Sequence, residues 1–112
     1  MRMWLCNPKH LCNKHLNAER YEIIKAVGNL RNTGRWANSL IKKGFLEPQN
    51  FRSRFDALTH EMLERGMNAG AVLNLDGIEI TKGKVDRNKS LLDLINRCPE
   101  CRGRFFRGFD YE

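Results

Sequence analysis

The residue types best suited to acid–base chemistry gather near the start of the chain. His15, Glu19 and Glu22 fall within two turns of a segment with helical spacing, so His15 and Glu22 can share one face of a helix. A carboxylate held there could stabilise a developing positive charge and transfer protons. Glutamates on a basic helix more often belong to a solvated surface, so the spacing alone supports both interpretations.

The chain has four cysteines, in one pair near each end. Cys98 and Cys101 have the Cys-x2-Cys spacing of a metal-binding knuckle, whereas five residues separate Cys6 from Cys12. Together they predict a four-thiolate zinc site that joins the ends of the chain, with His10 as a substitute ligand. Free thiols and disulfides are the alternatives. A redox function is disfavoured because no βαβ pattern surrounds the Cys-x-x-Cys pair.

The elements that must position these residues are helices, since apolar residues recur at spacings of three and four. The pattern predicts an all-α, compact single domain over residues 1–112, with three to four helices and long loops. The expected helices span about 8–27, 35–43, 48–65 and 89–97. Residues 67–87 are weakly patterned, with Ile78 and Ile80 as a candidate extended piece. Residues 97–112 are interpreted as a basic-aromatic tail.

Several local signals mark where these helices begin and end. Asn7 and Pro8 suit the cap and first position of the first helix, and Gly28 weakens its end. Gly66 suits the position just past the helix over 48–65. In that helix Glu61 and Arg65 form an i,i+4 pair of favourable orientation.

The positive charge of the chain is unevenly distributed. Residues 1–43 hold nine basic and two acidic side chains, whereas residues 44–112 hold eleven of each, so the net charge of +7 lies in the first segment. This segregation predicts a polyanionic partner and a first segment that faces a phosphate backbone; chance clustering is the simpler alternative. No apolar run approaches the ~20 residues that span a bilayer, and the first residues are unlike a secretory signal, so a cytoplasmic protein is expected.

Three stretches carry a resemblance to a known family. The first has the form L-x-x-x-H-L-x-A-E-x-x-E from Leu11 to Glu22; the second spans 27–31 and the third lies within 54–68. In these stretches the chain resembles the pyrimidine-dimer DNA glycosylases of the endonuclease V type found in T-even phages. The resemblance covers about 1–34 and 45–68, and it covers the C-terminal third poorly.

The resemblance implies a particular nucleophile. Its ungapped register places Met1 at the family's N-terminal catalytic position, where the α-amino group attacks. An α-amine has a pKa of about 7.7–8.0, far below that of lysine, so it can attack the sugar C1′ as a free base and form a Schiff base. Arg2 should block removal of Met1, because the initiator is normally trimmed only before small residues. Glu22 would then stabilise the cationic sugar and move protons.

The resemblance also implies contacts with DNA. Arg2 and Lys25 match basic positions that grip phosphate, and His15 matches a histidine near the amine. This chain has Tyr21 where the family has an active-site arginine, and Arg20 or Arg31 could replace that contact.

The C-terminal stretch departs from the family pattern. Arg104 belongs to a basic-aromatic run, 102–107, that suits unstacked bases; a disordered tail is the equal alternative.

We therefore expect a DNA repair enzyme, a glycosylase with AP-lyase activity on pyrimidine dimers or another damaged base. It would bind damaged double-stranded DNA as a monomer, and no membrane partner is expected. No cofactor would be required for catalysis, although a structural zinc ion is a candidate. The main alternative is a non-catalytic, zinc-stapled nucleic-acid-binding phage protein on the same fold. A membrane-surface or phage–host interaction module is less favoured, since no basic helix has a wide apolar face.

Overall fold

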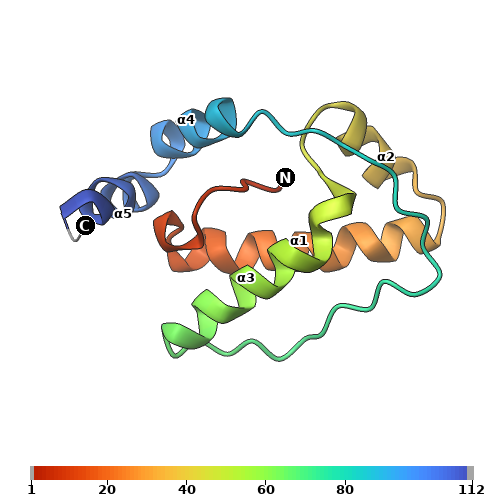
Figure 1. Ribbon diagram of the computed structural model, residues 1–112, viewed down its shortest axis with the longest axis horizontal. Coiled ribbons are helices and arrows are strands. Elements are labelled where there is room, and N and C mark those ends of the chain that lie inside the picture. Colours follow the sequence, from red (N-terminus) through yellow and green to blue (C-terminus); the bar gives the residue numbers. More distant parts are fainter. Residues whose placement is uncertain (1, 111–112) are drawn as a thin grey trace.

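The computed structural model describes residues 2–110, and the side chains of residues 2–107. The described residues form five α-helices and two short 3₁₀ helices, so the all-α prediction is confirmed with more helices than expected (Figure 1). In chain order these are η1 (Pro8–His10), α1 (Asn13–Arg31), α2 (Arg35–Lys42), η2 (Pro48–Asn50), α3 (Phe51–Glu64), α4 (Arg87–Arg97) and α5 (Pro99–Asp110). None of these helices is long and apolar enough to cross a membrane.

The helix predicted over 8–27 is divided into two. The Asn7 side chain caps only η1, accepting a hydrogen bond from the Lys9 N–H at 3.0 Å. A second start follows at Cys12, whose Sγ accepts from the His15 N–H at 3.5 Å. The helix then continues through Gly28 to Arg31. Glycine costs a helix only about 1 kcal/mol, and the tertiary packing of α1 exceeds that cost.

The core lies between α1, which runs along the length of the molecule, and α3, which packs across it (Figure 1). Leu16 and Ile23 of α1 are fully buried, as are Phe51 and Leu58 of α3. The two residues of each pair are seven positions apart, which puts one apolar stripe of each helix against the other. The α2 helix packs on the far half of α1 and buries Leu40.

The predicted C-terminal tail is a helix. Helix α5 begins at Pro99 and packs on α4 and on η1, so residues near both ends of the chain lie side by side. Leu94 of α4 and Cys101 of α5 are fully buried at this contact. Figure 1 shows α4 and α5 beyond the start of α1, on the side where the N-terminal segment runs.

Arginine side chains hold the long segment between α3 and α4, which contains no helix or strand. Arg52 donates to the Leu73 carbonyl at 2.7 Å, and Arg31 donates to the Asp76 carbonyl at 3.1 Å. Arg20 donates to the Ala71 carbonyl. The candidate extended piece around Ile78 and Ile80 forms no strand among the described residues.

Candidate functional site

The N-terminal segment lies against the first half of α1, on the side of His15 and Glu19. The Trp4 ring meets the His15 ring edge to face, with centroids 6.0 Å apart. The Met3 N–H donates to the Phe45 carbonyl at 2.9 Å, and both Met3 and Trp4 are buried. Met3 and Trp4 are thereby held beside α1; Met1 itself lies outside the described residues.

Arg2 is held by a carboxylate of α4 and by two aromatic rings. Its guanidinium donates to Asp93 of α4 at 2.7 Å and lies 4.5 Å from the Trp4 ring and 5.0 Å from the Phe45 ring. Arg2 is 9% exposed, so its guanidinium is not offered to a phosphate in the predicted manner. These contacts instead anchor Arg2, which follows the predicted nucleophile in sequence.

Glu19 and Glu22 occupy the same part of α1 but have opposite environments. Glu19 is buried and binds Arg54 through both oxygens, at 2.5 Å to Nε and 2.9 Å to Nη2. Arg54 also donates to the Cys6 carbonyl at 2.5 Å, which ties the N-terminal segment to α3. Burial alone would lower the pKa of Arg54, but the hydrogen bonds and charge of Glu19 raise it overall. Glu19 is a structural residue.

Glu22 is half-buried, and its Oε2 atom is buried without a hydrogen-bond partner among the described residues. An unsatisfied buried carboxylate oxygen is costly and uncommon in native structures, and such groups are found at functional sites. Glu22 is seven positions after His15, two turns along the same face of α1, so it lies on the side where Trp4 of the N-terminal segment contacts His15.

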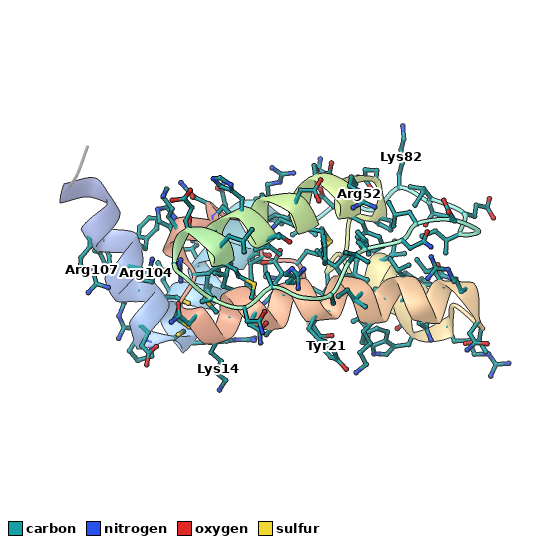
Figure 2. The ribbon with its side chains drawn as sticks, turned by 90° about the horizontal axis from the view of Figure 1, so that it is seen from below. Lys14, Tyr21, Arg52, Lys82, Arg104 and Arg107 are labelled. Carbon is teal, nitrogen blue, oxygen red and sulfur yellow. The ribbon has the colours of Figure 1, made fainter. Side chains whose placement is uncertain are left out.

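An exposed stripe with two lysines follows α1 beside Glu22. Lys14, Ala18, Tyr21 and Lys25 are spaced by four, three and four residues, and all are exposed. Figure 2 shows Lys14 and Tyr21 projecting from one side of α1, with Arg52 and Lys82 at the opposite edge of the molecule. The predicted phosphate contact Lys25 belongs to this stripe, with Nζ 5.0 Å from the centroid of the Trp36 ring.

The other predicted DNA-binding arginines have structural contacts. Arg20 is buried; it donates to Thr59 at 2.8 Å and lies 4.4 Å from the Phe55 ring, and burial lowers its pKa. Arg31 is exposed but bound to the 74–76 carbonyls. Arg104 is half-buried and donates to the Lys9 carbonyl at 2.9 Å. Because Arg20 is buried and already bound, it is not available to replace the arginine that the family has at the position of Tyr21.

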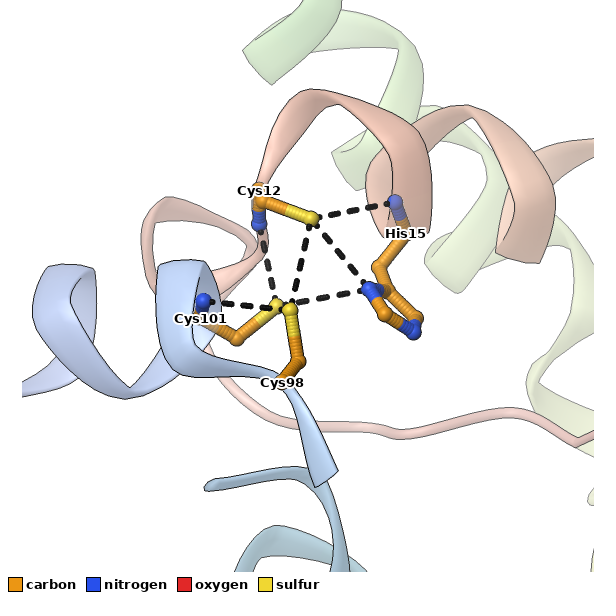
Figure 3. A group of neighbouring side chains, drawn as sticks. All are labelled: Cys12, His15, Cys98 and Cys101. Atoms are coloured by element: carbon orange, nitrogen blue, oxygen red, sulfur yellow. Dashed lines mark hydrogen bonds between the residues drawn. The ribbon is translucent and has the colours of Figure 1, made fainter. Parts of the chain in front are cut away.

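Three of the four cysteines converge, and the fourth ligand position is taken by a histidine (Figure 3). The Cys12 Sγ lies 3.8 Å from the Cys98 Sγ and 3.2 Å from the His15 Nδ1. The Cys101 Sγ lies 3.6 Å from the same Nδ1. These four ligand atoms all lie within 4.8 Å of one another, which is close enough to share one metal ion.

Cys6 does not belong to this group, in contrast to the predicted four-thiolate set. Its carbonyl is bound by Arg54, and burial raises the pKa of its thiol to about 11. The substitute ligand His10 packs against Phe105 of α5 instead, with ring centroids 4.9 Å apart. The Cys12-x2-His15 spacing was the sequence signal for the correct pair, because it repeats the interval of the Cys98-x2-Cys101 knuckle.

Burial and hydrogen bonds shift the pKa values of this group in different directions. Burial would raise the pKa of Cys98, but the Cys101 N–H and neighbouring thiols lower it overall. Burial raises the pKa of Cys101 well above its ordinary value. Burial, followed by the charge of Lys14, lowers the pKa of His15. A neutral imidazole is the form that binds a metal.

The family model described as pyrimidine dimer DNA glycosylase matches residues 1–74. This match spans more than half of the chain, so the chain belongs to that family, as its resemblance suggested. Neither a curated protein nor a solved structure matches the chain. Family membership makes the chain a DNA glycosylase of the repair class and implies damaged DNA as its substrate. Cys98 and Cys101 lie outside the matched residues.

Proposed function

We propose that the protein excises a damaged base from double-stranded DNA and then cleaves the strand as an AP lyase, acting as a monomer. The α-amine of Met1 is the nucleophile and Glu22 is the catalytic carboxylate. One observation carries the assignment of Glu22: its Oε2 is buried with no hydrogen-bond partner among residues 2–107, on the side of α1 where the N-terminal segment runs. Arg2, which follows Met1 in sequence, is held by Asp93, and Trp4 contacts His15 of α1, which supports a reaction at this end of the described chain.

In the proposed reaction the neutral α-amine attacks C1′ of the damaged nucleotide. The C1′–N glycosidic bond breaks, and its electron pair leaves with the base, which takes up a proton. The amine then loses a proton, the C1′–O4′ bond breaks as O4′ takes up a proton, and the opened sugar is left as an iminium. Removal of a C2′ proton then expels the 3′-phosphate by β-elimination, and water releases the amine. Glu22 stabilises the cationic sugar and iminium and accepts protons; no cofactor is needed.

The DNA backbone is proposed to follow the exposed stripe of α1 beside Glu22. Lys14 and Lys25 supply the phosphate contacts there, and the damaged nucleotide leaves the stack to reach C1′. Tyr21 lies between them and is 60% exposed, which leaves its ring accessible to a sugar or base.

The decisive experiment is borohydride trapping on duplex DNA that contains an abasic site or a pyrimidine dimer. The wild-type chain should form a covalent adduct, whereas Glu22→Gln should reduce trapping and cleavage by roughly 100-fold, the typical contribution of a general acid–base group. Glu79→Gln, at an exposed position of the 67–86 segment, is the matched control and should behave as wild type. Equal trapping by Glu22→Gln would overturn the assignment.

Peptide mapping of the trapped adduct identifies the attacking amine. The modified peptide should begin at Met1, and the intact mass should show that Met1 is retained and unacetylated. An adduct on a lysine ε-amine contradicts the α-amine mechanism while leaving AP-lyase activity in place.

A non-catalytic DNA-binding protein on the same fold is the second candidate. It is favoured by one difference from the family pattern. Tyr21 replaces the family's arginine, and Arg20 is committed to Thr59 and Ala71. This candidate predicts binding to damaged DNA with no adduct and no strand cleavage, so the trapping experiment separates the two.

A further inference from the structure

The cysteine–histidine group joins two parts of the chain that are far apart in sequence. Cys12 and His15 lie at the start of α1, inside the residues that match the family, whereas Cys98 and Cys101 lie at the α4–α5 junction outside them. All four side chains point toward one centre in Figure 3. This group takes no part in the proposed excision reaction.

Two of the separations between ligand atoms match those around a tetrahedral zinc ion, and a third is slightly shorter. Zn–S bonds of about 2.3 Å and a Zn–N bond of about 2.05 Å place two sulfurs about 3.8 Å apart and a sulfur about 3.6 Å from the nitrogen. The Cys12–Cys98 sulfurs are 3.8 Å apart, and the Cys101 sulfur lies 3.6 Å from the His15 Nδ1. The Cys12–His15 distance of 3.2 Å needs only a small outward movement.

Backbone donors around the sulfurs suit thiolates. The Cys12 N–H points at the Cys101 Sγ at 3.2 Å, and the Cys101 N–H points at the Cys98 Sγ at 3.4 Å. The His15 N–H points at the Cys12 Sγ at 3.5 Å, so each of the three sulfurs accepts a backbone N–H. Hydrogen bonds of this kind favour the charged form of the sulfur, which is the form that binds a metal.

A disulfide explains the arrangement less well. All four cysteines are free, and the Cys12–Cys98 sulfurs are nearly twice as far apart as a disulfide bond of about 2.05 Å. A disulfide would also use two of the three sulfurs and leave the third beside the imidazole. Four ligands around one centre are the full set of a structural site with no open position.

We propose that Cys12, His15, Cys98 and Cys101 bind one structural Zn²⁺ ion through three thiolates and the Nδ1 of His15. The ion fastens the C-terminal helices to the start of α1. It thereby also holds α4, whose Asp93 binds Arg2 next to the chain start. This role assigns His15 to the metal rather than to the predicted DNA contact, and it stands whether or not the chain is a lyase.

Metal analysis of the full-length protein, purified without chelators, tests the site directly. Elemental analysis and native mass spectrometry should find about one zinc per chain. Cys98→Ser and His15→Ala should each lower zinc affinity by roughly tenfold or more, since each removes one of four ligands. The matched controls are Cys6→Ser and His10→Ala, which should retain zinc at the wild-type level.

Spectroscopy of the wild-type protein keeps the proposal testable if a ligand variant fails to fold. Co²⁺ exchanged into the site should give the d–d absorption of a tetrahedral ion with thiolate charge transfer, and zinc X-ray absorption should fit three sulfurs and one nitrogen. A wild-type chain that neither carries nor takes up zinc overturns the proposal. A shell of four sulfurs, together with loss of zinc in Cys6→Ser, also overturns it. That result would show that Cys6, and not His15, is the fourth ligand.

Discussion

Two glutamates one turn apart on α1 show how much of this site depends on individual residues. Glu19 and Glu22 are the same residue type on the same helix, and spacing alone does not distinguish them. Family resemblance implies the catalytic role that we propose for Glu22. The structure shows a physical difference between them, because Arg54 binds both oxygens of Glu19, whereas Glu22 Oε2 has no hydrogen-bond partner in the part of the chain that the structure describes.

The buried pair leads to a prediction about stability. Arg54→Met should destabilise the fold by about 3–5 kcal/mol, because it leaves the buried Glu19 carboxylate without its partner. Urea unfolding measures the loss. The double variant Glu19→Leu with Arg54→Met should recover much of it, since no unpaired charge remains. Arg35→Met, at an exposed position on α2, is the control; an equal effect there would contradict the argument.

Glu47 leads to a prediction about pH. Burial would raise the pKa of its carboxyl, but hydrogen bonds from Val85, Asn50 and Arg87 lower it overall. The folded chain therefore binds this proton less readily than the unfolded chain does. The resulting stabilisation is complete above the ordinary glutamate pKa of about 4.3 and is lost as the pH falls through the lowered folded value.

Glu47→Gln removes that titration. The difference in unfolding free energy between wild type and Glu47→Gln should therefore shrink as the pH falls below about 4.3. Urea unfolding across a pH series measures it, with Glu79→Gln as the exposed control. A difference that stays constant with pH would contradict the role given to Glu47.

At the scale of elements, sequence periodicity predicted the helices better than their ends. The helix predicted over 35–43 and the one over 48–65 lie within one to three residues of α2 and α3, and the Glu61–Arg65 pair is present at 2.8 Å. The break before α1 was not predictable, because it depends on Cys12 acting as a cap. Helix α5 was missed since Gly103 and Gly108 weaken its helical propensity, and contacts with η1 and α4 compensate.

The segment between α3 and α4 gives a prediction at this scale. Arg20→Lys should accelerate amide hydrogen exchange in residues 67–86, because a lysine cannot reproduce the donors that reach both Thr59 and the Ala71 carbonyl. Exchange measured by mass spectrometry should show little change in α3. The control is Arg35→Lys on α2. Unchanged exchange in the 67–86 segment would mean that its other contacts suffice to order it.

At the scale of the whole molecule, several of the basic residues in the segregated segment are used in contacts within the fold. The net charge of +7 lies in residues 1–43, yet the structure commits Arg2 and Arg20 to interior contacts and Arg31 to loop carbonyls. The sequence could locate the basic segment. It could not separate cations that hold the fold from those that face solvent, because that division depends on partners far along the chain.

The exposed cations of α1 therefore give the last prediction. Lys14→Gln and Lys25→Gln should each weaken binding to duplex DNA several-fold, largely independent of sequence, and lower the slope of log K against log salt by about 1. Lys82→Gln is the matched control, since Lys82 projects from the opposite edge of the molecule (Figure 2). Fluorescence anisotropy over a salt series measures both quantities. If Lys82→Gln lowers the slope as much as Lys14→Gln does, the DNA does not follow α1, and the excess charge acts only as a diffuse attraction. A slope that falls only for the α1 lysines instead places the phosphate backbone beside Glu22, where the excision chemistry requires it.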